Sequence, residues 1–207
     1  MTPASDINKP FVGELLGRSD FAIIGDIVAP NSKVLDLGCG EGELLQWLAE
    51  NKGVDARGVE ISPIKVRRAI GRGVSAYQGD IDEGLADYPN GAFDYVILSQ
   101  TLQESRHPLT VLREMLRVGR RAIVAFPNFG HWRVRLSMLL SGRAPLTKLF
   151  PYEWYDSPNI HFLTVSDFEL LAAREGMHIE RRYFLAGSRR VSFLPNLMAE
   201  TAVFLVG

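Results

Sequence analysis

At 207 residues, with 46% hydrophobic and 23% charged residues, the chain is long enough to fold around one core without disulfides or metals. Its formal net charge of −1 argues against a nucleic-acid-binding protein, which would usually carry a clear basic excess. With a single cysteine, no secretory signal pattern and no apolar run long enough for a bilayer, we expect a cytoplasmic protein without membrane association.

The first part of the chain predicts helices and strands in alternation. Residues 1–17 are expected to form a loose arm, and residues 19–30 a helix capped by Ser19 or Asp20. Buried strands and helices then follow one another: the strands are expected at 33–38, 56–61, 74–80, 93–99 and 121–128, and the helices at 43–53, 62–73 and 107–119.

Apolar strands separated by helices are typical of a parallel sheet covered on both faces. The short connections require right-handed crossovers and therefore a doubly wound, Rossmann-like sheet. The tail differs, because a helix at 166–176 is followed by two strands, at 178–185 and 200–207, with no helix predicted between them. We therefore predict one α/β domain over residues 1–207, with a mostly parallel sheet and an antiparallel edge strand.

The strongest local signal is the sequence VLDLGCGEGELL, residues 34–45, in which a strand runs into three glycines and a helix follows at once. Glycines there let the backbone turn sharply and approach a ligand closely. The pattern is not the dinucleotide fingerprint, because the third glycine of that motif would fall at Glu43. The carboxylates of Asp36, Glu41 and Glu43 instead suit a positively charged ligand such as S-adenosylmethionine, which carries a sulfonium and an ammonium group.

This motif resembles motif I of the class I S-adenosylmethionine-dependent methyltransferases. The resemblance implies that the loop of Gly38, Cys39 and Gly40 passes under the methionine part of the cofactor, and that Asp36 helps to hold its amino group. Cys39 is expected to be a small packing residue rather than a nucleophile. The cofactor would be S-adenosylmethionine or its product S-adenosylhomocysteine.

Two further acidic residues match positions of the same family. Glu60, at a strand end, can accept hydrogen bonds from both ribose hydroxyls, and Asp80 matches the position that contacts the adenine amino group. Ile61 and Ile81, beside them, are expected to sandwich the adenine ring. A solvated acidic residue at a strand end or in a turn is the alternative for each carboxylate.

Residues 93–104 resemble motif IV, where a strand delivers groups towards the transferred methyl. Ser99 lies there among the expected cofactor contacts, followed by the polar residues Gln100 and Gln103. None of them is an evident base, so no catalytic residue is assigned. The four histidines lie far apart without metal-ligand spacing, so no metal site is expected.

Residues 129–162 form an aromatic-rich insertion that the fold does not require. A helix is expected at 131–142, with its apolar residues on one side: Trp132, Leu136, Leu139 and Leu140. Three interpretations stay open. The insertion is a lid packed on its own sheet, a surface that docks a partner, since aromatic residues and Arg are enriched at interfaces, or a pocket for an acyl or aromatic acceptor.

Five stretches carry a resemblance that goes beyond the fold: VLDLGCGEGELL, QGDIDEGLADYP, FDYVILSQTLQ, EMLRVGRRAIVAFPNFGHWRVRL and PYEWYDSPNIHF. They are similar to the MetW family of methionine biosynthesis, over about residues 18 to 185. The resemblance implies association with homoserine O-acyltransferase (MetX) and identifies no methyl acceptor. Three hypotheses follow: a partner of that enzyme that responds to S-adenosylmethionine, a methyltransferase for a small molecule, and a structural subunit without cofactor.

Overall fold

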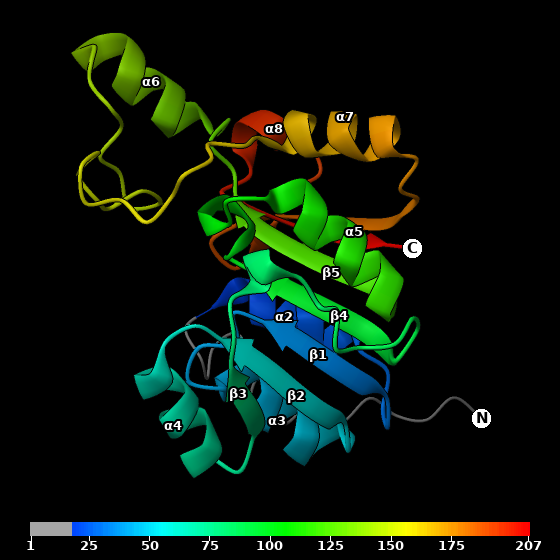
Figure 1. Cartoon of the computed structure of the whole chain (residues 1–207). Helices are drawn as coiled ribbons and strands as arrows, with labels where there is room; N and C mark the ends of the chain where they lie inside the picture. The colour runs from blue at the N-terminus through cyan, green and yellow to red at the C-terminus, as the bar shows by residue number, and fades with distance from the viewer. Residues whose placement is uncertain (1–17) are drawn as a thin grey trace.

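A computed structural model of the chain describes residues 18–207, so the arm expected at residues 1–17 lies outside the described residues. The centre of the fold is an eight-stranded sheet with the order β3-β2-β1-β4-β5-β8-β6-β7 (Figure 1). The strands are β1 (Lys33–Leu37), β2 (Asp55–Glu60), β3 (Ser75–Gln78), β4 (Phe93–Ser99), β5 (Gly119–Pro127), β6 (Ile179–Ala186), β7 (Arg189–Arg190) and β8 (Thr201–Val206).

The predicted fold class is confirmed. Strands β1 to β5 pair in parallel, while β8 is antiparallel to both β5 and β6. The last strand of the chain therefore lies between β5 and β6, and the sheet edge on that side is the short strand β7, which was not predicted. The antiparallel pair of the tail is thus present, with its second strand inside the sheet rather than at its edge.

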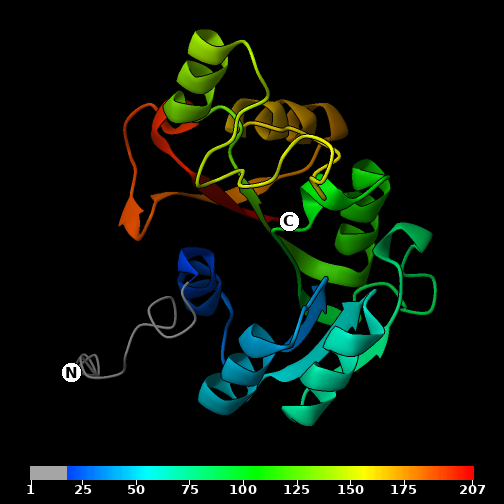
Figure 2. The ribbon, with the colours of Figure 1, turned by 90° about the vertical axis from the view of Figure 1, so that its left-hand side faces the viewer.

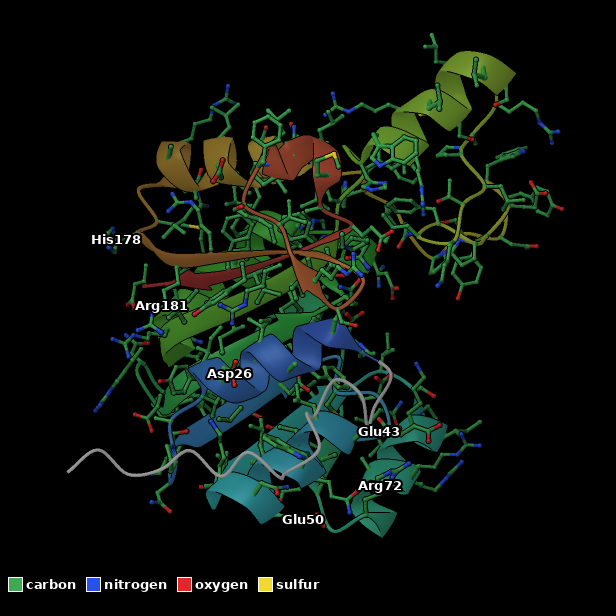
Figure 3. The ribbon with its side chains drawn as sticks, turned by 180° about the vertical axis from the view of Figure 1, so that it is seen from behind. Asp26, Glu43, Glu50, Arg72, His178 and Arg181 are labelled. Atoms are coloured by element: carbon green, nitrogen blue, oxygen red, sulfur yellow. The ribbon has the colours of Figure 1, made fainter. Side chains whose placement is uncertain are left out.

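Helices cover both faces of the sheet. They are α2 (Ser19–Ile27), α3 (Glu43–Lys52), α4 (Pro63–Gly71), α5 (Pro108–Val118), α6 (Trp132–Ser141), α7 (Val165–Glu175) and α8 (Pro195–Met198), with the 3-10 turns η1 (Ile81–Glu83) and η2 (Leu102–Glu104). Helices α2 and α3 pack on the face to which Val34 points, and α5 and α7 pack on the face of Leu35. Figure 3, seen from behind, shows α2 lying across its face. None of the helices in residues 18–207 has the length and apolar character needed to cross a membrane.

The helix ends follow local sequence signals. Pro63 occupies the first position of α4 directly after Ser62, where its missing N–H costs nothing. Helix α3 stops at Gly53, which has a φ of 63° in the left-handed region. Thr164 and Asp167 form a reciprocal capping box at the start of α7. These signals set where the three helices begin or end, and therefore where the chain passes between helices and strands.

The start of α2 differs from the expectation. Arg18 occupies the N-cap position instead of Ser19 or Asp20, and no side chain caps the helix. Asp20 lies inside the first turn and is buried, where it accepts hydrogen bonds from the Arg18 guanidinium and the Ser99 hydroxyl. One neighbouring partner, Arg18, and one distant in sequence, Ser99, thus engage the Asp20 carboxylate in place of the expected capping contact. They also tie α2 to the end of β4.

Candidate functional site

A cavity of about 410 Å³ opens at the carboxyl ends of the parallel strands. Its lining includes seven of the nine predicted cofactor contacts: Gly38, Gly40, Glu60, Ile61, Asp80, Ile81 and Ser99. The other two, Asp36 and Cys39, lie behind this lining and are buried. The residues brought together come from four strand ends, which is where open α/β sheets bind ligands.

Glu60 holds the glycine loop against α4. Its buried carboxylate accepts the backbone N–H of Gly40 at 3.0 Å through Oε2 and that of Ser62 at 2.9 Å through Oε1. Gly38 turns the chain with a φ of 76°, and a Cβ there would lie 2.6 Å from Thr101 Oγ1. A Cβ on Gly40, in contrast, would meet open space. The loop therefore presents bare backbone to the cavity.

Three buried carboxylates gather at the floor of the cavity, those of Asp20, Asp36 and Glu60. The cation that acts on Asp36 is Arg18, whose Nη2 donates to Asp20 Oδ2 and, at 2.8 Å, to Ser99 Oγ. Burial raises the pKa of Asp36 to about 7; Arg18 opposes this rise, and the negative charges of Asp20 and Glu60 add to it. The floor thus carries more acidic groups than cationic ones.

Cys39 packs under the loop instead of facing the cavity. A Cβ on Gly58 of β2 would lie only 2.4 Å from Cys39 Sγ, so the thiol fills the space that this glycine leaves. Burial raises the pKa of Cys39 to about 12, and the charges of Asp36 and Glu60 contribute to the rise. A thiol with this pKa is protonated at neutral pH and is a poor nucleophile.

The two other acidic residues of the glycine motif turn away from the cavity. Glu41 forms an ion pair with Arg68 of α4, and Glu43 pairs at 3.4 Å with Arg72, the residue that directly follows this helix (Figure 3). Of the three carboxylates that suggested a cationic ligand, only Asp36 therefore lies near the cavity. The negative charge there comes instead from Asp20 and Glu60, which lie elsewhere in the sequence.

Asp80 and Asp82 build the side wall of the cavity. Asp82 accepts hydrogen bonds from the Ser105 hydroxyl and from the N–H groups of Arg106 and His107. Although burial opposes it, these bonds lower the pKa of Asp82. Asp80 accepts the N–H of Asp82 through Oδ1 and the Arg106 guanidinium through Oδ2, both at about 3 Å. Arg106 thus occupies one oxygen of the residue predicted to contact adenine.

The turn η2 contributes cavity residues that the sequence analysis did not select. Glu104 lies at the rim, where partial burial raises the pKa of its carboxyl, Lys65 lowers it and Glu60 raises it further. Gln103, in contrast, points into the protein, and its backbone carbonyl accepts the N–H groups of Ile160 and His161. Ile160 lines the cavity as well, so the end of the aromatic insertion forms part of its wall.

Comparison with known families identifies the chain's relatives. The family described as "Methionine biosynthesis protein MetW" matches residues 18–206. The chain is 34% identical over 191 residues to a bifunctional methionine biosynthesis protein MetXA/MetW of Rhodopirellula baltica, and 33% identical over 94 residues to an ajmaline N-methyltransferase of Rauvolfia serpentina. The matches cover 86% and 42% of the chain, but only 31% and 32% of those relatives. The chain thus spans about a third of their length.

Solved structures share the fold at low sequence identity. An S-adenosylmethionine-dependent methyltransferase from Thermotoga maritima superposes with a TM-score of 0.66 at 17% identity, covering 94% of this chain and 90% of that one. The [4+2]-cyclase SpnF superposes with a TM-score of 0.65 at 15% identity, covering 90% and 79%. Because one of these proteins is named as a cyclase, the shared fold by itself does not specify methyl transfer.

The raised pKa of Asp36 predicts a specific dependence of stability on pH. Between about pH 4 and 7 the Asp36 carboxyl keeps its proton in the folded protein but releases it in the unfolded chain. Its contribution to the free energy of unfolding therefore falls as pH rises, by up to about 1.4 kcal/mol per pH unit. The amide side chain in the Asp36→Asn variant is uncharged at every pH, so this decrease in stability should be absent from the variant. Urea unfolding at pH 5 and pH 7.5 measures it.

The exposed Asp87 offers the matched control for this experiment. Asp87→Asn should follow the wild-type dependence on pH. If the free energies of unfolding of Asp36→Asn and the wild type instead change in parallel between the two pH values, the buried Asp36 carboxyl does not keep its proton. The raised pKa assigned to it at the cavity floor is then wrong.

Proposed function

The chain belongs to the MetW family of methionine biosynthesis proteins, and on this basis we propose that it binds S-adenosylmethionine and acts with homoserine O-acyltransferase (MetX) in methionine synthesis. The observation that carries the proposal is the cavity at the strand ends, whose floor holds three buried carboxylates with Arg18 beside them, while Lys65 and Arg106 belong to its wall. S-adenosylmethionine is made from methionine, so a protein that binds it can report end-product supply to an enzyme at the entry of the pathway.

The residues of the cavity fit this cofactor. A volume of about 410 Å³ is in the range of ligand pockets, and the bare backbone at Gly40 leaves room for close approach. The sulfonium and ammonium groups would be stabilised by the carboxylates of Asp36 and Asp20. Each Glu60 oxygen accepts only one backbone N–H and keeps a second lone pair for a ribose hydroxyl. Ile61, which is exposed, offers an apolar surface to the adenine.

The partner is supported by the relative from Rhodopirellula baltica. Its printed name combines MetXA with MetW in one bifunctional protein, and this chain matches about a third of it. A covalent link keeps two modules at high local concentration, which is useful when they act on the same process. We infer that the separate chain meets the acyltransferase as a non-covalent partner. A ligand that favours one arrangement of such a complex changes its affinity typically by about 5- to 150-fold.

One observation favours a second candidate function, S-adenosylmethionine-dependent methylation of a small molecule. Glu104 lies at the rim of the cavity with a raised pKa, which is the property expected of a carboxylate that removes a proton near neutral pH. The cofactor, when bound, would supply an electrophilic methyl group. Glu104 would then accept the proton that an acceptor hydroxyl or ammonium releases.

Calorimetry with S-adenosylmethionine tests the proposed cofactor. Glu60→Gln removes the charge that the ribose hydroxyls would meet and should weaken binding about 10- to 100-fold, since a hydrogen bond to a charged group contributes about 1.5–3 kcal/mol. Glu50→Gln, an exposed carboxylate on α3, is the matched control and should bind as the wild type does. Equal affinity of both variants would contradict the assignment of Glu60.

Co-purification with the homoserine O-acyltransferase tests the proposed partnership. The complex should form, and its dissociation constant should change at least about fivefold when S-adenosylmethionine is added at saturation. In the Glu60→Gln variant the same change should require a correspondingly higher concentration of the cofactor. If the dissociation constant of the complex is the same at all concentrations of S-adenosylmethionine, the proposed response to the cofactor is wrong and the partnership still stands.

The methyltransferase alternative has its own test. If Glu104 is the base, S-adenosylhomocysteine should appear when candidate acceptors are added, and Glu104→Gln should lower its rate of formation by about 100-fold or more without changing cofactor affinity. Glu83→Gln, an exposed carboxylate in η1, serves as the control. A variant that keeps the wild-type rate and its pH profile would exclude Glu104 from the chemistry.

A further inference from the structure

The insertion at residues 129–162, here called the aromatic lobe, stands apart from the sheet. The chain leaves β5 at Phe129, and the N–H of this residue donates to the carbonyl of Leu163 at 3.0 Å, which closes the neck of the lobe. Figures 1 and 2 show α6 projecting from the body, with the following loop beside it. Helix α6 thus projects from the body, while the end of the lobe at Ile160 lies against η2 and lines the cavity.

The lobe nevertheless has a core of its own. The ring of Phe129 packs on Phe162 at 4.7 Å and on Phe150 at 5.2 Å between centroids, and Phe150 is buried. Arg135 Nε donates to the carbonyl of Gly130 at 2.6 Å and fixes α6 on the neck. These contacts give the lobe a defined shape, so that its outer surface is presented in a defined arrangement.

That outer surface is strongly apolar. Leu139 is 81% exposed, Leu140 77% and Trp154 75%. Leu136 lies on the same side of α6 as Leu139 and Leu140, one helical turn earlier, and is also exposed. In α6 only Val134 is buried. Monomeric soluble proteins rarely leave such a patch in water, and patches of this kind mark sites of association.

We propose that the outer face of the aromatic lobe is the surface that docks the homoserine O-acyltransferase. The inference rests on the proposed function for the identity of the partner, and on the lobe for the place of contact. The exposed leucines of α6 at the centre of the patch require an apolar depression on the partner. Residues 132–143, which contain α6, carry three arginines and no acidic residue, whereas the acidic residues of the lobe, Glu153 and Asp156, lie in the loop that follows. The rim of the depression beside α6 should therefore be acidic.

The charges on α6 also speak against a second copy of the chain as the occupant. In a two-fold symmetric contact the same patch faces itself. When α6 packs antiparallel on α6 of the other copy, Arg133 of one copy lies near Arg143 of the other, and Glu200 of its own chain, 3.9 Å from Arg133, only partly offsets this. Like charges across an interface are unfavourable. A different protein with carboxylates at the rim meets the same surface without this repulsion.

The position of the lobe suits a partner that responds to the cofactor. Ile160 belongs to the lobe and lines the cavity, and its N–H donates at 2.8 Å to the carbonyl of Gln103 in η2. A ligand in the cavity would therefore lie beside a residue at the base of the lobe. Binding of the cofactor in the cavity and binding of the partner at the lobe can therefore be coupled through this wall of the cavity.

The experiment compares two leucine variants of the full chain. Leu139→Asp places a charge at the centre of the patch, and Leu170→Asp places the same charge on exposed α7, away from the lobe. Calorimetry with purified homoserine O-acyltransferase should show a dissociation constant at least tenfold higher for Leu139→Asp and a wild-type value for Leu170→Asp. Both variants should keep wild-type affinity for S-adenosylmethionine, which reports on an intact fold.

Each other outcome overturns a specific part of the inference. If the wild-type chain does not bind the acyltransferase, the partnership fails and the docking surface with it. If the wild type binds and Leu139→Asp binds equally well, the partnership stands and the surface is wrong. The surface is also wrong if Leu170→Asp weakens the complex as much. If sedimentation shows that Leu139→Asp converts a dimer of the chain into a monomer, the patch joins copies of this chain instead.

Discussion

The cavity depends on one buried carboxylate, that of Glu60. Its two oxygens accept N–H groups from Gly40, in the loop after β1, and from Ser62, before α4. Hydrogen bonds to a charged group are about twice as strong as neutral ones, and without them the buried charge would be costly. Because the same carboxylate joins the ends of two neighbouring strands, the glycine loop and α4 keep a fixed separation. The crevice between them therefore exists before any ligand enters.

Around Glu60, negative charge is only partly compensated. Arg18 is committed to Asp20 and Ser99, so it stabilises the ionised form of Asp36 only from a distance, and burial wins. The Asp36 carboxyl is therefore only partly ionised near neutral pH. A cationic ligand in the cavity would favour the ionised carboxylate and complete the charge balance, whereas a neutral ligand would not. This difference would make the floor favour a positively charged ligand over a neutral one.

The sequence predicted those parts of the fold and site that depend on local patterns. The parallel strands and the glycine loop follow from residues adjacent in the chain, whereas Glu60 and Asp80 were expected from the family resemblance, and both line the cavity. Asp20 was predicted as a helix cap, because nothing in its neighbourhood shows that Ser99, 79 residues later, would donate to it. Glu41 was expected near a cationic ligand, but arginines of α4 bind it outside the cavity. Partners far apart in sequence thus decided the cases that local reasoning missed.

The turn η2 is where the cavity and the aromatic lobe share structural elements. Gln100, directly before it, has a φ of 58°, a backbone conformation that costs a non-glycine residue energy. The side-chain amide of Gln103 donates to the carbonyl of Gln100, while its Oε1 is buried without a hydrogen-bond partner among residues 18–207. Gln100 and Glu104 line the cavity, so a ligand that contacts them can change the arrangement of this segment. Since Gln103 also holds Ile160, such a change would move the base of the lobe, and the site and the surface would respond together.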